Sequence, residues 1–519
     1  MNNPFDSCQY FVRIKYKMLR AFLCIIVLSG TTQAATHYVV PTNTAAANPY
    51  TNWATAGTSI IDVVNAAMTN TATRVVWVTN GIYRLTNEVL VTNALTIQSV
   101  NGRDVTIVNG NYPTTTNRCF ELNDGNAVVG GFTITNGYLI GSNGGGIYLA
   151  NGMVNNCLIS GNIVTNDGSA TNAGGGIYMT AGIVSNCMII GNVVTSSAAP
   201  SIHNTGGGIC IMAGIMYGGT VSYNRARWGG GIAGYNNVSI IKACTVLSNN
   251  ATYGGGIFSS GSIISNCNVT GNTASVYGGG VEADYGIMDN CTIVGNWCGT
   301  GYGGGVMIRN SALLRNSVIR GNSSAGGFGG GGVVFSSGGI MYNCLIAGNL
   351  ATNAGNYGGG GGIYFETIKS SHGWVSSCTI VSNISTKGGG GGGIFLYDTN
   401  NDNTVSNCVI YGNTAANANY NDVCATNMLA NSNTFNYCCF SDPSHAFSGT
   451  GNTTNNPNFV DFNGGNYRLT VNSPCVNTGS NQDWMTNGVD LDGRRRIRYG
   501  IVDMGAYENI REGNLYYIR

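Results

Sequence analysis

The sequence predicts an all-β fold: a right-handed parallel β-helix with a short N-terminal capping helix and a C-terminal capping segment. Three observations predict it. A phrase of the form C-x-I-x-G-N alternates with a triple glycine followed by Ile or Val, and successive copies are about 27 residues apart. Both phrases place apolar residues two positions apart, which is the period of a β-strand. Repeats of this length that cannot bury an apolar face alone stack into a solenoid.

The composition agrees with a glycine-rich folded protein. Glycine accounts for 80 of the 519 residues. Charged residues make up 9% of the chain, against a usual level of about 25%. The hydrophobic share of 43% excludes a disordered polar chain, and the glycines follow no three-residue collagen period. The net charge of +1 and the absence of a basic patch argue against a nucleic-acid partner.

The first segment has the pattern of a signal peptide. Basic residues within 13–20 precede the apolar stretch "AFLCIIVLSG" and the small residues of "TTQAA". We expect residues 1–34 to be the signal, with cleavage after Ala34 or Ala35; a signal that starts at Met18 fits the same pattern. No later stretch has the ~18 consecutive apolar residues of a membrane span. The sequence therefore predicts an exported protein, extracellular or on the outer cell surface, whose mature chain has no transmembrane segment.

Three regions follow the signal. Residues 35–110 are predicted to form the N-terminal cap and the first coils, residues 111–440 the β-helix coils, and residues 441–519 the C-terminal segment. A cap is needed because an open solenoid end exposes strand edges. The stretch "TSIIDVVNAAM" predicts the capping helix, since one of its faces carries only apolar residues. These are Ile60, Val63, Val64 and Ala67.

The cysteine of the first phrase is predicted to point into the core. Eight repeats carry it, at Cys157, Cys187, Cys244, Cys267, Cys291, Cys344, Cys378 and Cys408. Two other repeats have Gly219 and Ser317 there, which indicates selection for small volume. Disulfides are the weaker interpretation, because stacked side chains point the same way. Zinc is weaker still, because converging histidines are lacking.

Two further positions of the same phrase are constant. Two residues after the cysteine position comes Ile159, Ile189, Val221, Val246, Val269, Ile293, Ile319, Ile346, Ile380 or Ile410. Five residues after it comes Asn162, Asn192, Asn224, Asn249, Asn272, Asn296, Asn322, Asn349, Asn383 or Asn413. We expect the aliphatic residues to face inward with the cysteines. We expect the asparagine amides to stack and bond along the solenoid.

An aromatic residue immediately before the glycines recurs in six successive repeats. It is Trp228, Tyr253, Tyr277, Tyr302, Phe328 or Tyr357. One aromatic per coil makes a stripe along the solenoid, and aromatic faces suit sugar rings, so these residues are candidates for carbohydrate binding. Alternatively, the rings stack on one another and shield glycine backbone.

One cluster of charged residues stands out among sparse acids. When repeats are aligned on the residue after the triple glycine, Asp284 and Arg309 share one position in neighbouring coils, with Glu282 two residues before Asp284. Two acids and an arginine can hold a calcium ion or a uronate, or form a surface ion pair that contributes little. No other metal or cofactor is predicted. His372 lies in an insertion without matching acids, and no residue can be assigned as catalytic.

The C-terminal segment carries a more specific pattern. It contains "NPNFV" at 456–460, Tyr467, Leu469, Ser473 and Pro474, then "DLDG" at 490–493, Arg495 and "VDMGAYE" at 502–508. With the opening "YVVPTNTAAANPYTNWATAGTSI", these motifs resemble bacterial secreted β-helix proteins of the choice-of-anchor Q type. The internal repeats are also similar to those of polymorphic outer-membrane proteins. The resemblance implies a fold shared with pectate lyases and polygalacturonases, although fold alone does not give function.

The residues favour a binding scaffold over an enzyme. The leading hypothesis is an exported β-helix for extracellular or cell-surface recognition that binds a glycan or another surface partner. A polysaccharide lyase or glycoside hydrolase is the alternative, and a purely structural adhesion protein is the third. Neither a paired-Asp motif nor a His-Gly motif of the polygalacturonase kind occurs. The sequence makes no prediction of oligomeric state.

Overall fold

The computed structural model describes most of the chain after the predicted signal. The described residues are 35–69, 74–166, 172–196, 204–327, 329–352, 359–366, 372–386, 389–397, 402–425, 433–441 and 449–509. The predicted signal peptide, Phe328 and Tyr357 lie outside them. Among the described residues, no helix is long and apolar enough to cross a membrane.

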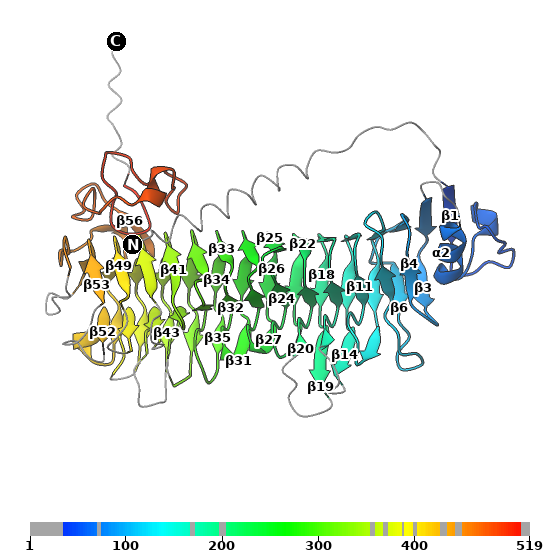
Figure 1. The fold of residues 1–519 in the computed structure, drawn as a ribbon, viewed down its shortest axis with the longest axis horizontal. Helices are drawn as coiled ribbons and strands as arrows, with labels where there is room; N and C mark the ends of the chain where they lie inside the picture. Colours follow the sequence, from blue (N-terminus) through cyan, green and yellow to red (C-terminus); the bar gives the residue numbers. More distant parts are fainter. Residues whose placement is uncertain are drawn as a thin grey trace, which may run out of the picture.

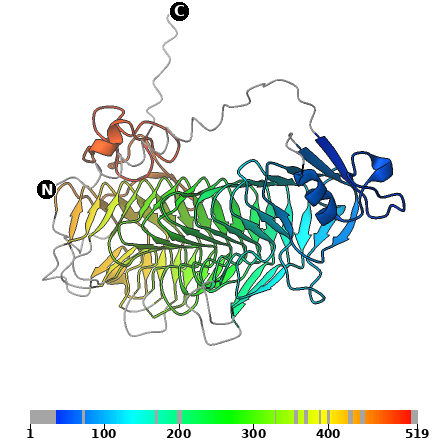
Figure 2. The ribbon, with the colours of Figure 1, turned by 45° about the vertical axis from the view of Figure 1, so that its right-hand side comes forward.

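The predicted parallel β-helix is confirmed. In a representative coil the chain passes through β28 (Ile257–Ser260), β29 (Ile263–Ser265), β30 (Asn268–Thr270) and β31 (Thr273–Tyr277), then enters the next coil at β32 (Val281–Asp284). Each strand pairs in parallel with its equivalents one coil before and one coil after. Figures 1 and 2 show the result, a long stack of coils with the N-terminal cap at one end.

Four long sheets run along the solenoid, here called A, B, C and D. Sheet A has 15 strands, sheet B has 14, sheet C has 13 and sheet D has 7. Sheet A runs from β1 (Ala35–Val39) to β53 (Thr434–Asn436), and sheet B from β3 (Gly81–Arg84) to β54 (Cys439–Phe440). Sheet C runs from β4 (Val89–Val91) to β52 (Val423–Ala425), and sheet D from β27 (Asn250–Tyr253) to β51 (Thr414–Ala415).

The strands that carry later arguments belong to sheets A and C. In sheet A they are β12 (Met153–Asn155), β17 (Ile183–Ser185), β22 (Gly214–Tyr217), β25 (Ser239–Lys242), β33 (Ile287–Asp289), β37 (Leu313–Arg315), β41 (Gly339–Tyr342) and β45 (Gly373–Ser376). In sheet C they are β36 (Val306–Arg309), β40 (Val333–Phe335), β44 (Ile363–Phe365) and β48 (Ile394–Leu396).

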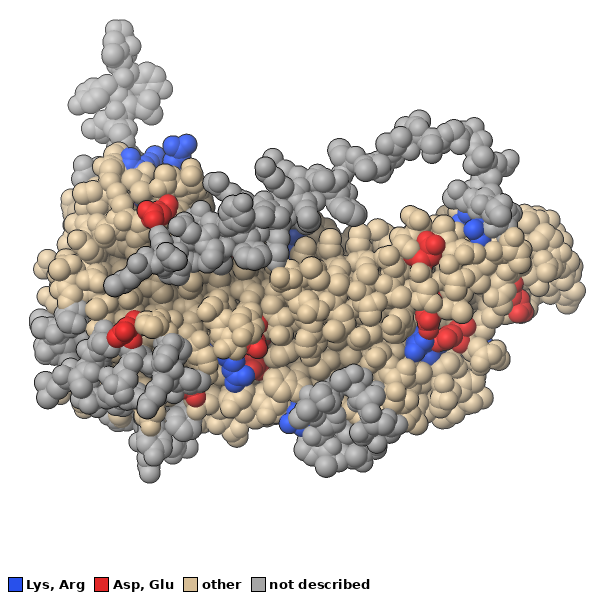
Figure 3. All heavy atoms as spheres, viewed as in Figure 1, with Lys and Arg blue, Asp and Glu red and all other residues tan. Residues whose placement is uncertain are grey.

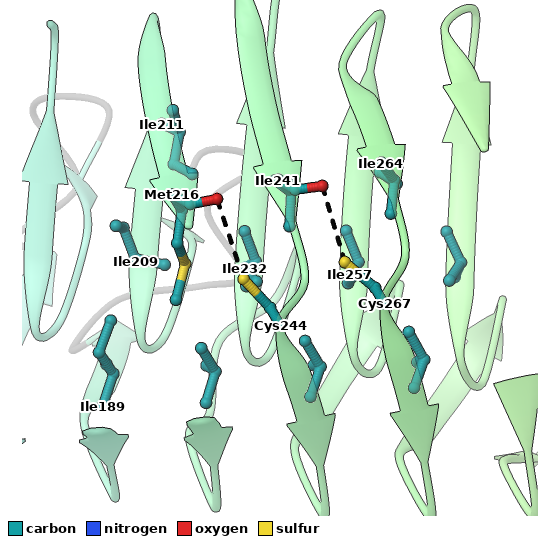
Figure 4. Packing of buried hydrophobic residues seen from close by; sticks show 14 of the residues in the cluster. Ile189, Ile209, Ile211, Met216, Ile232, Ile241, Cys244, Ile257, Ile264 and Cys267 are labelled. Atoms are coloured by element: carbon teal, nitrogen blue, oxygen red, sulfur yellow. Dashed lines mark hydrogen bonds between the residues drawn. The ribbon is translucent and has the colours of Figure 1, made fainter. Parts of the chain in front are cut away.

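The core confirms the inward position of the cysteines. All eight predicted cysteines are free and buried. The ten aliphatic residues two positions later are buried too. Figure 4 shows Cys244 and Cys267 on successive coils between inward isoleucines, with each thiol near a backbone carbonyl of the preceding coil. Cys438 comes directly before Cys439, which pairs in register with Val409, so Cys438 extends the cysteine ladder by one coil beyond Cys408, although the phrase around it has lost its asparagine.

The predicted asparagine ladder is also confirmed. Each of the ten side chains is buried, and in each step the backbone N–H and the Nδ2 amide donate to the Oδ1 of the next asparagine. Nδ2 also donates to a backbone carbonyl of the preceding coil, such as Val246 O from Asn272 at 2.9 Å. The ladder therefore satisfies buried polar groups at the turn between sheets B and D.

A second asparagine, directly before the cysteine position (Ser317 in one coil), has a structural role that the sequence analysis missed. In seven coils it adopts a left-handed backbone conformation, with φ between 51° and 54°. These residues are Asn156, Asn186, Asn266, Asn290, Asn316, Asn343 and Asn407. Asparagine tolerates this conformation better than most residues, so it recurs at the sharp turn from sheet A to sheet B.

The N-terminal cap contains the predicted helix. Helix α2 spans Ile60–Met68 and buries the four predicted apolar residues. Ser59 caps its N-terminus by accepting from the backbone N–H of Asp62. At the other end Arg74 donates to the carbonyls of Ala67 and Met68 in the last turn, where helix carbonyls need partners from outside the helix. The helix covers the first strands of sheets A and C.

The C-terminal segment closes the last coil and then folds back along the flank. Thr453 exchanges backbone hydrogen bonds with Cys438 and Phe440 at the edge of sheet B. The strands β55 (Phe459–Asp461) and β56 (Asn466–Leu469) form an antiparallel hairpin. The remainder packs on the outward faces of sheets A and B over the last coils, as Figure 1 shows near β41 and β49 (Thr404–Ser406).

A buried ion pair and the hydrogen bonds around it hold the C-terminal segment together. Arg496 is fully buried; its Nε lies 3.3 Å from Glu508 Oε1, and its Nη2 donates to the carbonyls of Asp503 and Gly505. Asp490 accepts backbone N–H groups from both the "DLDGR" turn and Glu508. The two acidic motifs quoted for the family resemblance are thus joined in space through backbone hydrogen bonds and one arginine.

Candidate functional site

The candidate site lies on the outward face of sheet C, where one position is apolar or aromatic in almost every coil. It is the residue directly after the Ile or Val that follows the triple glycine. From β28 onward its occupants, paired in register, are Phe258, Glu282, Met307, Val334, Tyr364, Phe395 and Cys424. Glu282 is the charged member of this series. A carboxylate at such a position is costly and therefore indicates either a structural ion pair or a function.

Glu282 is buried beside one arginine. Its exposed fraction is 0%, and its Oε1 lies 2.9 Å from Nη1 of Arg309, whose side chain is 25% exposed. Within the described chain neither Glu282 oxygen has a hydrogen-bond partner. Burial raises the pKa of Glu282 to about 7; Arg309 counteracts the shift and Asp284 adds to it. A carboxyl group in this state can exchange a proton near neutral pH.

The structure brings the predicted charged residues together with different partners. Asp284 and Arg309 do pair in register, as the alignment predicted. Arg309, however, binds Glu282, and Asp284 accepts a hydrogen bond of 2.6 Å from Nδ2 of Asn310. Glu282 points away from the coil interior, but it is not solvent-exposed. The two acids therefore do not form an open pair that faces solvent.

The aromatic residues form a stacked ladder over this face. The ring centroids of Trp228 and Tyr253 lie 4.1 Å apart, those of Tyr253 and Tyr277 5.4 Å, and those of Tyr277 and Tyr302 5.5 Å. The stack continues from Tyr302 to Tyr364 at 5.9 Å. Because neighbouring rings occupy one another's faces, the half-buried aromatics offer ring edges and hydroxyl groups more than open faces.

Tyr277 is the ring of the aromatic ladder that contacts the Glu282–Arg309 ion pair. The guanidinium carbon of Arg309 lies 4.8 Å from the centre of the Tyr277 ring, a cation–π contact. Burial raises the pKa of Tyr277, and the Arg309 charge opposes that shift. Arg309 thus bridges a buried carboxylate and the exposed part of the aromatic ladder.

Two residues of this region were not placed in the site by sequence reasoning. Tyr364 is fully buried, and its hydroxyl has no hydrogen-bond partner among the described residues. The half-buried Glu366 lies near Tyr302, whose pKa is raised by burial and by the Glu366 charge. The register alignment contained a signal for Tyr364, since it shares the position of Glu282.

A similar charged group occurs near the N-terminal end of sheet C. Glu121 holds the position that Glu282 holds further along, and it pairs with Arg118. The guanidinium carbon of Arg118 lies 5.3 Å from the centre of the Tyr148 ring. Here the acid side chain is 22% exposed and a second acid, Glu88, joins at 2.9 Å. The difference in burial makes this group a matched control for Glu282.

Charged side chains are sparse in this protein, at 9% of its residues. Figure 3 shows one face of the molecule on which Lys, Arg, Asp and Glu occur only in small scattered groups. Within the described ranges, no three His, Cys, Asp or Glu side chains converge as metal ligands would. His372 has an acidic neighbour that the sequence analysis did not match to it: its Nε2 lies 3.4 Å from Asp402 Oδ2, with both side chains more than half exposed.

Comparisons with known proteins give no family assignment. No family model and no curated protein matches the chain. Among solved structures, the chain is similar to a crystal structure of pectate lyase Pel9A, with 12% identity, a TM-score of 0.30 and coverage of 93% of this chain and 98% of the other. It is also similar to a complex structure of XylC with xylose, with 8% identity, a TM-score of 0.29 and coverage of 92% and 99%. The fold assignment rests on the strand pairing described above.

Proposed function

We propose that this chain is an exported scaffold that binds an acidic glycan along the aromatic ladder, with Arg309 as the residue that contacts the ligand carboxylate. The observation that carries the proposal is the buried Glu282 in an otherwise apolar series: its ion-pair partner Arg309 is partly exposed, and its Oε2 has no hydrogen-bond partner among the described residues. Such a group costs several kcal/mol unless it is compensated. The presence of this buried carboxylate is more easily understood if a bound ligand completes the site.

The mechanism follows from the position of Arg309. Its guanidinium is the partly exposed member of the pair, and it already lies against Tyr277. A uronate carboxylate can therefore compete with Glu282 for the same cation. The tyrosine hydroxyls next to it can bond sugar hydroxyls, one coil at a time, at the ~4.8 Å spacing of the strands.

This sharing of Arg309 makes binding depend on pH. When the ligand takes the guanidinium, Glu282 is left as a buried carboxylate without a partner, and it is stabilised by taking up a proton. Because the pKa of Glu282 is about 7, lower pH supplies that proton and strengthens binding. The affinity should fall as the pH rises through 7.

The test is a binding titration of the full chain with polygalacturonate, with a neutral polysaccharide as the ligand control. We expect Arg309→Ala to weaken binding at least tenfold, and Arg118→Ala, whose acidic partner Glu121 is partly exposed, to leave it unchanged. Glu282→Gln should bind at all pH values without the decline near pH 7. Equal binding by wild type and Arg309→Ala would refute the site, and equal binding of neutral and acidic polymers would refute the ligand class.

The role of the ladder is tested by removing hydroxyls and keeping rings. Replacing Tyr253, Tyr277 and Tyr302 together by Phe preserves the stacking and deletes the hydroxyls. We expect weaker glycan binding with unchanged unfolding. Replacement of the same residues by Ala should also destabilise the coils, because each ring packs on its neighbours. Full affinity in the triple Phe variant would remove the ladder from the site.

Cleavage of the polysaccharide is the second candidate function. It is favoured by one observation: a carboxyl group with a pKa about 7 lies 2.9 Å from an arginine, and such a group can act as acid or base at neutral pH. In that case wild type releases unsaturated or reducing ends from the polymer, and Glu282→Gln, Asp284→Ala and Arg309→Ala do not. Equal cleavage by all three variants would exclude this cluster as the active site.

A further inference from the structure

Two cysteines outside the core ladder, Cys439 and Cys475, meet where the C-terminal segment packs on the last coil. Cys439 lies in β54 of sheet B; its neighbour Cys438 packs in the coil interior, whereas Cys439 faces outward. Cys475 follows the hairpin of β55 and β56. Both thiols are free and fully buried. They share one hydrophobic cluster, whose buried members are Val409, Cys439, Leu469, Cys475 and Met504.

The two thiols contact each other, and the backbone on each side holds them there. A hydrogen bond between the thiols, followed by burial, raises the pKa of Cys439. Cys439 forms a parallel β-bridge with Thr453, and its thiol donates to the carbonyl of Asn455 at 3.2 Å. The carbonyl of Cys475 accepts from the N–H of Met504 at 2.9 Å. Both cysteines are thus anchored at the junction between sheet B and the segment.

This junction differs from the core ladder in the direction of its side chains. Ladder cysteines lie on successive parallel strands, ~4.8 Å apart, with Cα–Cβ bonds that point the same way. A disulfide needs Cβ atoms ~3.8 Å apart and side chains that converge. Cys439 and Cys475 come from two surfaces that face each other, the outward face of sheet B and the segment that covers it. Their side chains therefore converge, as those of disulfide partners do.

We propose that Cys439 and Cys475 form a disulfide that locks the C-terminal segment onto the last coil. The reaction is exchange with a donor disulfide, carried by a small molecule or by an oxidoreductase. One cysteine thiolate attacks the donor and releases one donor thiol; the second cysteine then attacks the mixed disulfide and releases the other. The two cysteines lose two electrons and two protons, and the donor disulfide becomes two thiols. The export predicted from the sequence would bring the chain to such a donor.

The bond is expected to form while the segment docks and not in the finished structure. In the folded chain both thiols are buried, and the raised pKa of Cys439 leaves little thiolate, which is the attacking species. Before docking, both thiols are exposed and have the ordinary pKa of ~8.5. Docking then brings the two sulfurs together, so oxidation and docking favour each other.

The lock keeps an apolar surface covered. On the outward face of sheet A, from β33 to β45, the segment packs against Ile287, Leu313, Ile340 and Trp374. The equivalent residues of four earlier strands lie outside this contact and are partly exposed. They are Met153 in β12, Ile183 in β17, Ile215 in β22 and Ile240 in β25. The disulfide closes a loop of about 36 residues, so opening of the segment should become about a hundredfold rarer.

Peptide mapping of the full chain tests the bond. The protein is secreted into an oxidising compartment, or refolded with a glutathione redox pair, and unfolded with an alkylating reagent. We expect a peptide pair joined through Cys439 and Cys475, and two fewer alkylated thiols than after reduction with dithiothreitol. The matched control is Cys438→Ala, which removes the neighbouring inward thiol and should leave the bond in place. Alkylation of both Cys439 and Cys475 in both preparations, or a bond from either to another cysteine, overturns the proposal.

Limited proteolysis with and without reductant tests the lock itself. We expect reduction to speed cleavage of the segment about a hundredfold in wild type and in Cys438→Ala. Cys475→Ala should be cleaved at one rate whether or not reductant is present. Each protein is compared only with itself, so a loss of packing in the variant does not affect the result. Equal cleavage of oxidised and reduced wild type would refute the lock.

Discussion

The asparagine ladder makes a quantitative prediction through the substitution Asn272→Ala. The Asn272 side chain is fully buried and takes part in five hydrogen bonds. Its Oδ1 accepts from the backbone N–H and the Nδ2 of Asn249, at 2.9 and 3.0 Å. Its Nδ2 donates to Val246 O, Thr270 O and Asn296 Oδ1, at 2.9, 3.2 and 3.0 Å. Alanine removes all five.

The magnitude follows from which groups lose their partners. The buried backbone N–H of Asn249 loses its acceptor, at a cost of about 1–3 kcal/mol. Nδ2 of Asn249 keeps carbonyl partners in Val221 and Leu247, so that loss is closer to the ordinary net value of ~1 kcal/mol. With the lost donations to Val246 and Asn296, the sum is about 3–5 kcal/mol. Since 1.4 kcal/mol corresponds to a factor of ten, local opening should become roughly 100- to 3000-fold more frequent.

Hydrogen exchange by mass spectrometry measures this locally. We expect faster exchange in β30 and in the strands paired with it, because a solenoid couples nearest neighbours. The control is Asn268→Ala in β30, the strand just before Asn272, where the side chain is exposed, and it should change exchange little. If Asn272→Ala exchanges like wild type, or if both variants exchange alike, the ladder does not stabilise the coils as argued.

Three further predictions concern the core thiols and the C-terminal segment. The ladder cysteines should resist maleimide in the native protein and react after denaturation, since all eight thiols are buried; a disulfide found among them by mass spectrometry would contradict this. Burial raises the pKa of Glu508 from 4.5 to about 8. The native state therefore holds a proton that the unfolded state has lost, and stability falls as the pH rises through that window. Limited proteolysis of the segment should accelerate from pH 5 to 8 in wild type and not in Glu508→Gln; the same pH dependence in both would refute the assignment. Trp484→Ala should loosen the segment by about 3–5 kcal/mol, because the indole is buried against Tyr342 at a ring distance of 4.4 Å, and unchanged proteolysis would show that this contact is dispensable.

The family resemblance of the C-terminal segment stays a prediction, but the structure explains why its motifs occur together. The residues of "DLDG" and "VDMGAYE" surround Arg496, which neither motif contains. Of the basic residues between these motifs the sequence analysis named only Arg495, and it did not foresee a fully buried guanidinium at Arg496.

The sequence by itself determined the solenoid and the contents of its core. Cys267, Val269 and Asn272 stand at fixed offsets within one phrase, and stacking at one strand spacing puts equivalent residues over one another. The inward packing of the cysteine and the aliphatic residue, and the hydrogen bonds of the asparagine ladder, then follow from the local sequence pattern alone. The capping helix was equally readable, since Ile60, Val63 and Val64 define its buried face at helical spacing.

The tertiary structure decided what covers the outward faces. Alignment places Glu282 and Arg309 in neighbouring coils, but a strand pattern cannot show that Glu282 is buried. Nor can it show that Arg309 pairs with Glu282 rather than with Asp284, or that its guanidinium lies against the Tyr277 ring. Likewise, the docking of Trp484 on sheet A joins residues more than one hundred positions apart in the chain. Inward positions are fixed by the neighbouring coils, which the repeat itself specifies. Outward positions depend on segments outside the repeat, and these are placed only when the whole chain folds.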